Sequence, residues 1–125
     1  MTATPEPLAE ALRLQLEAAR LGFDWRHLGE LWDKLAEETV ELQQAAGEGR
    51  ERAQDELGDL LFMVVNLARH LGVDASAALT GANAKFSRRF SHILQNLEKL
   101  PDLGHPQRID AMEAFWQEAK RFEKT

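Results

Sequence analysis

The sequence predicts an all-α protein, a helical bundle of about five helices. Three observations point to this class. Apolar residues recur with helical spacing along most of the 125 residues, sustained alternation typical of strands is missing, and glycine or proline marks the ends of the periodic segments. Strand-forming residues are scarce, since there is no Tyr and few β-branched clusters occur outside Val64-Val65. A chain of this length predicts one domain with a modest core.

Helices are expected over residues 6–21, 28–46, 50–71, 75–100 and 111–124. Pro5 and Pro7 stand at the start of the first helix and Gly22 follows its end, which is the usual order of start and stop residues. The second helix stops at the Gly-rich turn 47–49, and the third stops at Gly72.

The last two helices have weaker boundaries. Asp74 is the expected N-cap of the fourth helix, and Pro101 marks its end. Asp110, followed three residues later by Glu113, resembles a capping box that opens the fifth helix. The whole chain, 1–125, is expected to form a single domain, with an N-terminal helix in 1–22, core motifs in 28–98 and a C-terminal helix in 110–124.

Composition excludes several classes of function. With no Cys, the chain has no disulfide, thiolate metal site or cysteine nucleophile. The net charge of −6 argues against binding to a nucleic-acid polymer or an anionic membrane. No apolar run approaches about 20 residues, the length needed to span a membrane. Residues 1–10 lack the basic and apolar regions of a secretory signal, so the cytoplasm is the expected compartment.

The charge is unevenly distributed. Residues 30–60 carry a net charge of −7, whereas residues 84–99 carry +3. A helical wheel for 28–46 places Glu38 near the apolar stripe, Glu41 further round and Glu37 nearly opposite. The apolar stripe of that helix consists of Leu28, Leu31, Trp32, Leu35, Thr39 and Leu42.

The same construction for 50–71 places Glu56 and Asp59 along one margin of the apolar stripe, followed by Met63 and Asn66. That stripe, which we expect in the core, consists of Leu57, Leu60, Leu61, Val64, Leu67, Ala68 and Leu71. In 75–100 the expected core face is flanked by the basic residues Lys85 and Arg89. That face consists of Leu79, Phe86, Phe90, Ile93, Leu94 and Leu97.

Four carboxylates are expected to converge at one end of an antiparallel hairpin formed by 28–46 and 50–71. They are Glu38, Glu41, Glu56 and Asp59. Such a cluster repels itself unless a cation compensates it, and Mg²⁺ prefers oxygen ligands. The alternative is a pair of solvated acidic helices with ion pairs such as Lys34 with Glu38. No His lies three residues after any of these acids, which disfavours a di-iron site, and zinc is disfavoured because His and Cys clusters are missing.

Several blocks of the sequence resemble the MazG family of nucleoside triphosphate pyrophosphohydrolases. The acidic signature of that family is matched by Glu37-Glu38-Thr39-Val40-Glu41 and by Glu56-Leu57-Gly58-Asp59. Further matching blocks lie at 55–62, 65–69, 83–90 and 112–120, in the same order. The resemblance covers about residues 20–123.

This resemblance implies Mg²⁺-dependent cleavage between the α and β phosphates, with Mn²⁺ as an alternative ion, yielding a nucleoside monophosphate and pyrophosphate. It makes Glu38, Glu41, Glu56 and Asp59 the metal ligands. By the same resemblance, Glu37 either activates the attacking water or makes a contact outside the set of metal ligands. Gly58, inside a helix, is expected to permit close packing of helices behind the ligands.

The resemblance also implies a substrate-binding set. Lys85 and Arg89 match phosphate-binding positions. Asn83 either lines the site or caps a local turn, and Asn66 either contacts the nucleotide or bonds between helices. Trp116 either stacks on the base or packs in the core. Phe23 and Trp25 resemble an aromatic turn of the family, for which packing is the expected role.

The sequence therefore predicts an Mg²⁺-dependent nucleoside triphosphate pyrophosphohydrolase with a house-cleaning role toward non-canonical nucleotides. Relatives of this size assemble through apolar surface, so a homodimer or homotetramer is expected. One alternative is a narrower enzyme of the dimeric dUTPase or phosphoribosyl-ATP pyrophosphatase type. The other is a non-catalytic helical interaction module of the same fold.

Overall fold

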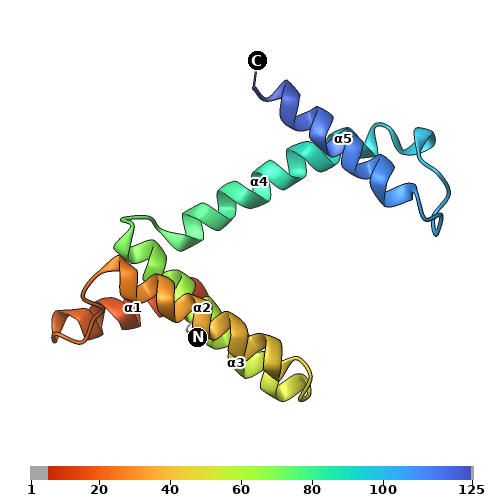
Figure 1. Ribbon diagram of the computed structural model, residues 1–125. Coiled ribbons are helices and arrows are strands. Elements are labelled where there is room, and N and C mark those ends of the chain that lie inside the picture. The colour runs from red at the N-terminus through yellow and green to blue at the C-terminus, as the bar shows by residue number, and fades with distance from the viewer. Residues whose placement is uncertain (1–5, 125) are drawn as a thin grey trace, which may run out of the picture. The chain divides into compact units, whose positions relative to one another are not determined.

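The computed structural model describes residues 6–124, and these residues form helices and no strands (Figure 1). The all-α prediction with five α-helices is confirmed. The elements are α1 (Pro7–Arg20), α2 (Leu28–Ala45), α3 (Arg50–His70), α4 (Ala75–Leu94), the short 3₁₀ helix η1 (Leu97–Lys99) and α5 (Arg108–Phe122). The predicted role of Pro5 and the outermost ends of the predicted domain lie outside the described residues.

The chain divides into two compact units, with the boundary between Ala78 and Leu79 inside α4. The first unit contains α1, α2, α3 and the first turn of α4. The second contains the rest of α4, η1 and α5. The expectation of a single domain stays a prediction.

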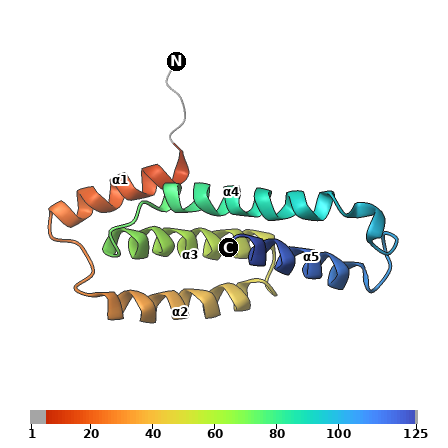
Figure 2. The same ribbon diagram turned by 90° about the horizontal axis from the view of Figure 1, so that it is seen from above.

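An antiparallel hairpin of α2 and α3 forms the body of the first unit (Figure 2). Its most deeply buried apolar side chains are Leu31, Ala45 and Val65. The turn between the helices requires Gly49, whose φ of 114° lies in the left-handed region that side chains disfavour. This turn sets the pairing of the two helices and so decides which of their side chains meet.

α1 packs on α3 in the same unit. Glu6 caps α1, since its carboxylate accepts hydrogen bonds from the backbone N–H groups of Leu8 and Ala9. The buried side chain of Gln15 donates a hydrogen bond from Nε2 to the carbonyl oxygen of Phe62 at 3.0 Å. This contact fixes α1 against the middle of α3.

Aromatic rings join α4 and α5 in the second unit. The rings of Phe86 and Trp116 lie 5.4 Å apart, and His92 meets Phe115 and Phe122 edge-on. Among the described apolar side chains of this unit, only Ile93 and Ala119 are buried. The unit is therefore held together by a thin layer of contacts.

Two predicted helix boundaries are wrong. α4 ends at Leu94 rather than at residue 100, because Asn96 donates from Nδ2 to the carbonyl oxygen of His92 and closes the last turn. α5 begins at Arg108 rather than at residue 111. Asp110 therefore lies inside the first turn, where its negative charge interacts favourably with the helix dipole, and it does not act as the N-cap.

The predicted core faces are buried only in part. Within the α3 stripe, Leu57, Leu61, Val64 and Leu71 are between 41% and 52% exposed. The buried side of α3 instead carries Met63, Val65 and Asn66, because this side faces α2 and α1. Trp32 of α2 and Leu79, Phe86, Leu94 and Leu97 of the fourth predicted stripe are also about half exposed.

The expectation for Gly58 is also wrong within the described chain. A Cβ atom built at this position meets no other atom within 4 Å, so no helix approaches closely there. Among the described residues, no single helix is long and apolar enough to span a membrane; α3 and α4 pass such a test only when taken together as a pair.

Candidate functional site

Three carboxylates meet where α2 and α3 pair. Glu38 comes from α2, and Glu56 and Asp59 lie one turn apart on α3. One oxygen atom of each carboxylate lies within 4.8 Å of the others. Glu38 is only 6% exposed, Glu56 is half-buried and Asp59 is exposed. We call these three residues the carboxylate cluster.

Each of the two deeper carboxylates has one oxygen in an ion pair and one free oxygen. Lys34 lies 3.3 Å from Oε1 of Glu38, and Arg52 lies 3.7 Å from Oε1 of Glu56, in both cases from the preceding helical turn. Oε2 of Glu38 and Oε2 of Glu56 are buried and have no hydrogen-bond partner. A buried oxygen with no partner is costly, so the cluster is incomplete without a ligand.

Electrostatics at Glu56 reflect the same incompleteness. Burial raises the pKa of the Glu56 carboxyl above its ordinary value, and the negative charges of Glu41 and Asp59 raise this pKa further. The guanidinium of Arg52 offsets only part of the repulsion. A bound cation would offset the repulsion that raises this pKa.

The other two predicted acids stand outside the cluster. Glu41 is exposed, although its charge reaches Glu56. Glu37 is also exposed, and Lys34 lies 4.0 Å from its Oε1. Lys34 therefore stands between Glu37 and Glu38.

The carboxylate cluster fits a hard divalent cation. Its donors are oxygens alone, which suits Mg²⁺ and Mn²⁺. The two free Oε2 atoms supply lone pairs that no protein group uses. Nitrogen and sulfur donors are not among the groups that meet here, so the donor set is unsuited to zinc.

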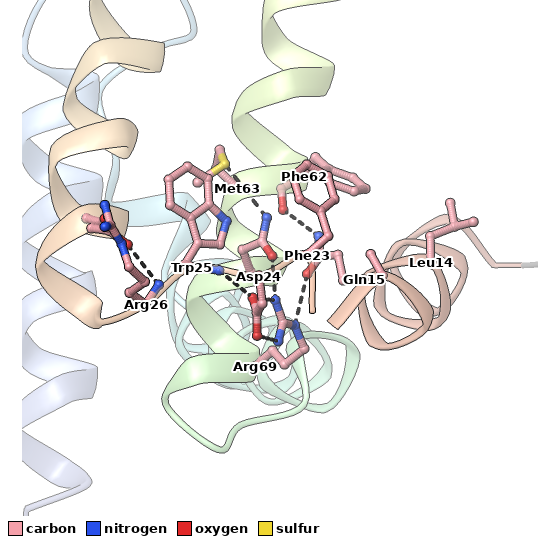
Figure 3. Close-up of a pocket in the computed structure, with 12 residues that line it drawn as sticks. Leu14, Gln15, Phe23, Asp24, Trp25, Arg26, Phe62, Met63 and Arg69 are labelled. Carbon is pink, nitrogen blue, oxygen red and sulfur yellow. Dashed lines mark hydrogen bonds and ion pairs between the residues drawn. The ribbon is translucent and has the colours of Figure 1, made fainter. Parts of the chain in front are cut away.

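A cavity of about 470 Å³ lies further along α3 (Figure 3). Its walls come from α1, the 21–27 loop, the start of α2 and the second half of α3. The lining is mostly apolar and includes Leu14, Phe23, Trp25, Phe62 and Met63, together with Asn66. Glu56, Asp59, Met63 and Asn66 are spaced by three, four and three residues, so they follow one face of α3. The cavity and the carboxylate cluster therefore share that face.

An ion pair closes one wall of this cavity (Figure 3). Arg69 donates from Nη1 and Nη2 to the two carboxylate oxygens of Asp24, at 2.9 and 2.7 Å. These bonds hold the pKa of the Asp24 carboxyl well below its usual range, and hydrogen bonds from His70 and from the backbone N–H of Trp25 add to the effect. We call Asp24 and Arg69 the clamp, because they join the 21–27 loop to α3.

The remaining predicted residues belong to the second unit. Lys85 and Asn83 are exposed on α4. Arg89 donates to Oε2 of Glu123 from Nε and Nη2, at 3.1 and 2.9 Å, and its guanidinium lies over the ring of Trp116. The structure therefore brings Arg89 and Trp116 together, while Trp116 also packs on Phe86.

Sequence reasoning missed the clamp and Arg52, and assigned Phe23 and Trp25 to packing alone. The spacing of four residues between Arg52 and Glu56 was a usable signal for that pair. Asp24 and Arg69 are 45 residues apart, and no spacing rule connects a loop residue to a distant helix.

A family model described as MazG nucleotide pyrophosphohydrolase domain matches residues 27–94, more than half of the chain. The matched segment contains the carboxylate cluster, the clamp residue Arg69 and the basic residues Lys85 and Arg89.

Three relatives are similar to the chain. The nucleoside triphosphate pyrophosphohydrolase of Escherichia coli (strain K12) is 40% identical over 121 residues, which cover 93% of the chain and 45% of the relative. The nucleoside triphosphate pyrophosphohydrolase/pyrophosphatase MazG of Thermotoga maritima is 37% identical over 118 residues, covering 94% and 46%. The uncharacterized protein YabN of Bacillus subtilis is 38% identical over 73 residues, covering 55% and 14%. The chain spans about half the length of the first two relatives.

Proposed function

The chain belongs to the family of MazG nucleotide pyrophosphohydrolase domains, and from this premise we propose that it is a Mg²⁺-dependent nucleoside triphosphate pyrophosphohydrolase. In the proposed reaction, water is added across the α–β anhydride bond, giving a nucleoside monophosphate and pyrophosphate. The observation that carries the proposal is the carboxylate cluster with its two free, buried oxygens. Such a cluster is suited to a cation that also binds phosphate oxygens.

We assign the cation to Glu38, Glu56 and Asp59, with Glu41 completing the set. Mg²⁺ is the proposed ion and Mn²⁺ its substitute. When bound, a divalent cation offsets the negative charge that develops on phosphate oxygens. Lys34 and Arg52 form ion pairs with the other oxygens of Glu38 and Glu56, which leaves the two Oε2 atoms for the cation.

Glu37 is assigned an outer contact in place of direct water activation. Lys34 lies between Glu37 and Glu38, so the charge of Glu37 reaches the cluster through that ammonium group. Glu37 and Glu38 both attract Lys34, whose ammonium lies closer to Glu38.

We assign the triphosphate to the basic residues of α4. Lys85 is the exposed cation, and Arg89 is held by Glu123 beside Trp116. Asn83 lies on the same helix and is proposed to line the phosphate path. Trp116 is proposed to act through Arg89, whose guanidinium lies over its ring.

The nucleoside end of the substrate is assigned to the cavity. Asn66 follows Asp59 by seven residues, a rise of about 10 Å along α3. Phosphates held at the carboxylate cluster thus leave the sugar and base to extend along the helix toward Met63 and Asn66. Trp25 and Phe23 supply aromatic surface in the same cavity.

Assembly into a homodimer or homotetramer is part of the proposal. Apolar side chains of α3 that are about half exposed supply the surface for it, and burying them in an interface is favourable. We place the activity in the cytoplasm, where nucleoside triphosphates are made and used, with removal of non-canonical nucleotides as its role.

Product analysis by ³¹P NMR tests the proposed reaction. A panel of standard, deoxy and damaged triphosphates is incubated with the protein and Mg²⁺. We expect a nucleoside monophosphate and pyrophosphate in equal amounts, and no turnover after EDTA treatment. Release of orthophosphate, or turnover that persists in EDTA, contradicts the proposal. Turnover of one base alone indicates the narrower dUTPase or phosphoribosyl-ATP pyrophosphatase type, and no turnover indicates the non-catalytic module.

A further inference from the structure

The cavity contains two buried amide side chains that differ in one respect. Gln15 and Asn66 are each about 5% exposed, and each turns its amide oxygen toward the guanidinium of Arg69. Nη2 of Arg69 donates to Oδ1 of Asn66 at 2.8 Å, and Nε donates to Oε1 of Gln15 at 3.4 Å. Arg69 carries donors and no acceptors, so both amides are forced into this orientation.

The two amide nitrogens then have different surroundings. Nε2 of Gln15 donates to a backbone carbonyl oxygen at 3.0 Å, so Gln15 is satisfied within the fold. Nδ2 of Asn66 has only the sulfur of Met63, at 3.8 Å. A thioether is a weak acceptor, and Met63 and Asn66 both line the cavity. Asn66 thus presents a buried N–H donor that no oxygen or nitrogen atom of the described residues satisfies.

The N–H donors of Arg69 are mostly used by other groups of the protein. It makes two bonds to Asp24, one to Asn66 and one to Gln15, which use four of its five N–H groups. Its side chain is 13% exposed. The bidentate pair with Asp24 fixes the plane of the guanidinium, so this group acts on a ligand through Asn66.

We propose that Asn66 reads the nucleobase by donating a hydrogen bond from Nδ2 to an acceptor atom on its edge, and that Arg69, fixed by Asp24, is the positioning residue that sets this polarity. The ligand is a nucleotide whose base offers a carbonyl oxygen or a ring nitrogen to the far end of the cavity. A base that lacks this acceptor leaves the donor buried and unpaired, which makes its binding weaker. The inference rests on the proposed nucleotide site and adds its specificity.

Binding of nucleoside monophosphates tests the inference, with inorganic tripolyphosphate as the probe that lacks a base. Affinities are measured by calorimetry in Mg²⁺ buffer for the wild-type chain and for Asn66→Asp, which keeps an oxygen for Arg69 but replaces the donor by an acceptor. We expect monophosphate affinity to fall about tenfold or more in Asn66→Asp relative to tripolyphosphate affinity. The new negative charge should weaken the binding of both monophosphate and tripolyphosphate, whereas the loss of the N–H donor should weaken only the binding of the ligand that has a base. Gln95→Glu, on the exposed end of the second unit, controls for an added charge.

Arg69 variants test the positioning role. Arg69→Met frees the amide of Asn66 to turn, so we expect monophosphate affinity to fall and discrimination to weaken. Arg69→Lys keeps a donor and should restore most of both. Thermal melting of each variant confirms that it is folded. Equal monophosphate affinity in Arg69→Met and wild type overturns the positioning role.

Analogues give a measurement that needs no variant. The wild-type chain is titrated with monophosphates in which one ring nitrogen is replaced by C–H or one carbonyl oxygen is removed. At least one analogue should bind about tenfold more weakly than its parent. Equal affinities throughout, or a parallel loss of monophosphate and tripolyphosphate binding in Asn66→Asp, overturn the inference. Monophosphate binding that depends on Asn66 supports it even in a chain that releases no pyrophosphate, an outcome that contradicts the proposed function alone.

Discussion

The carboxylate cluster and the clamp both gather charged side chains on α3, but they resolve their electrostatics in opposite ways. The cluster collects charges of one sign, and two of its buried oxygens have no partner. The clamp joins opposite charges in a bidentate pair, and Asp24 also accepts hydrogen bonds from His70 and from the backbone N–H of Trp25. The carboxylate cluster is therefore a site that gains from a bound ligand, whereas the clamp is a contact that stabilises the fold.

Substitutions in the carboxylate cluster should change activity more strongly than any other substitution. Glu38→Gln or Asp59→Asn removes a negative charge from the proposed cation site, so pyrophosphate release should fall at least about a hundredfold. Far-UV circular dichroism should show nearly unchanged helicity. Asp33→Asn, an exposed acid on α2, is the matched control and should retain activity. Full activity in Glu38→Gln would contradict the assignment of the cation site.

Stability should respond in the opposite sense in the two regions. Asp24→Asn leaves Arg69 without its charged partner, so the free energy of unfolding should drop by about 1–3 kcal/mol. Glu56→Gln relieves repulsion in the metal-free protein, so unfolding should become harder. Urea denaturation in EDTA measures both. A higher free energy of unfolding in Asp24→Asn, or a lower one in Glu56→Gln, would contradict the distinction between the clamp and the carboxylate cluster.

The pH dependence of stability should also have opposite signs. The folded pKa of Asp24 is lowered, so its contribution is present above the ordinary pKa of an aspartate and is lost as the pH falls below it. The folded pKa of Glu56 is raised, so its contribution is present below the ordinary pKa of a glutamate and is lost as the pH rises through the raised value. The free energy of unfolding is measured by denaturation from pH 2 to 7 in EDTA. The part of its pH dependence that arises from Asp24 should vanish in Asp24→Asn, and the part that arises from Glu56 should vanish in Glu56→Gln. Unchanged slopes in both variants contradict these assignments.

Gly58 should give the smallest effect. Its open surroundings and helical position predict that Gly58→Ala stabilises the chain by about 0.5–1 kcal/mol. Thermal melting at several protein concentrations checks this. A destabilised variant that also dissociates would instead place Gly58 in a contact between copies of the chain.

Local sequence rules found the helices and the acids but could not find the clamp. Helical periodicity predicted the ends of α1, α2 and α3 to within one residue. It missed the end of α4, because Asn96 bonds back to His92 and Pro101 comes only later. The acidic spacing predicted a cluster, of which Glu38, Glu56 and Asp59 meet within 4.8 Å.

Burial was less predictable than helicity. The apolar stripe of α3 was assigned to the core, yet Leu61 and Leu71 are about half exposed, while the polar Asn66 is buried. An apolar stripe predicts that a face will be covered, but it does not say by what. The orientation of Asn66 depends on Arg69, and the place of Arg69 depends on a loop residue 45 positions earlier.

Calorimetric titration of the metal-free chain with Mg²⁺, without nucleotide, tests whether the carboxylate cluster binds a cation. The two unpartnered buried oxygens and the raised pKa of Glu56 predict saturable binding to the wild-type chain and to Asp33→Asn, with binding lost in Glu38→Gln. Failure of the wild-type chain to bind Mg²⁺, or binding to Glu38→Gln with wild-type affinity, would contradict the assignment of the carboxylate cluster as a cation site.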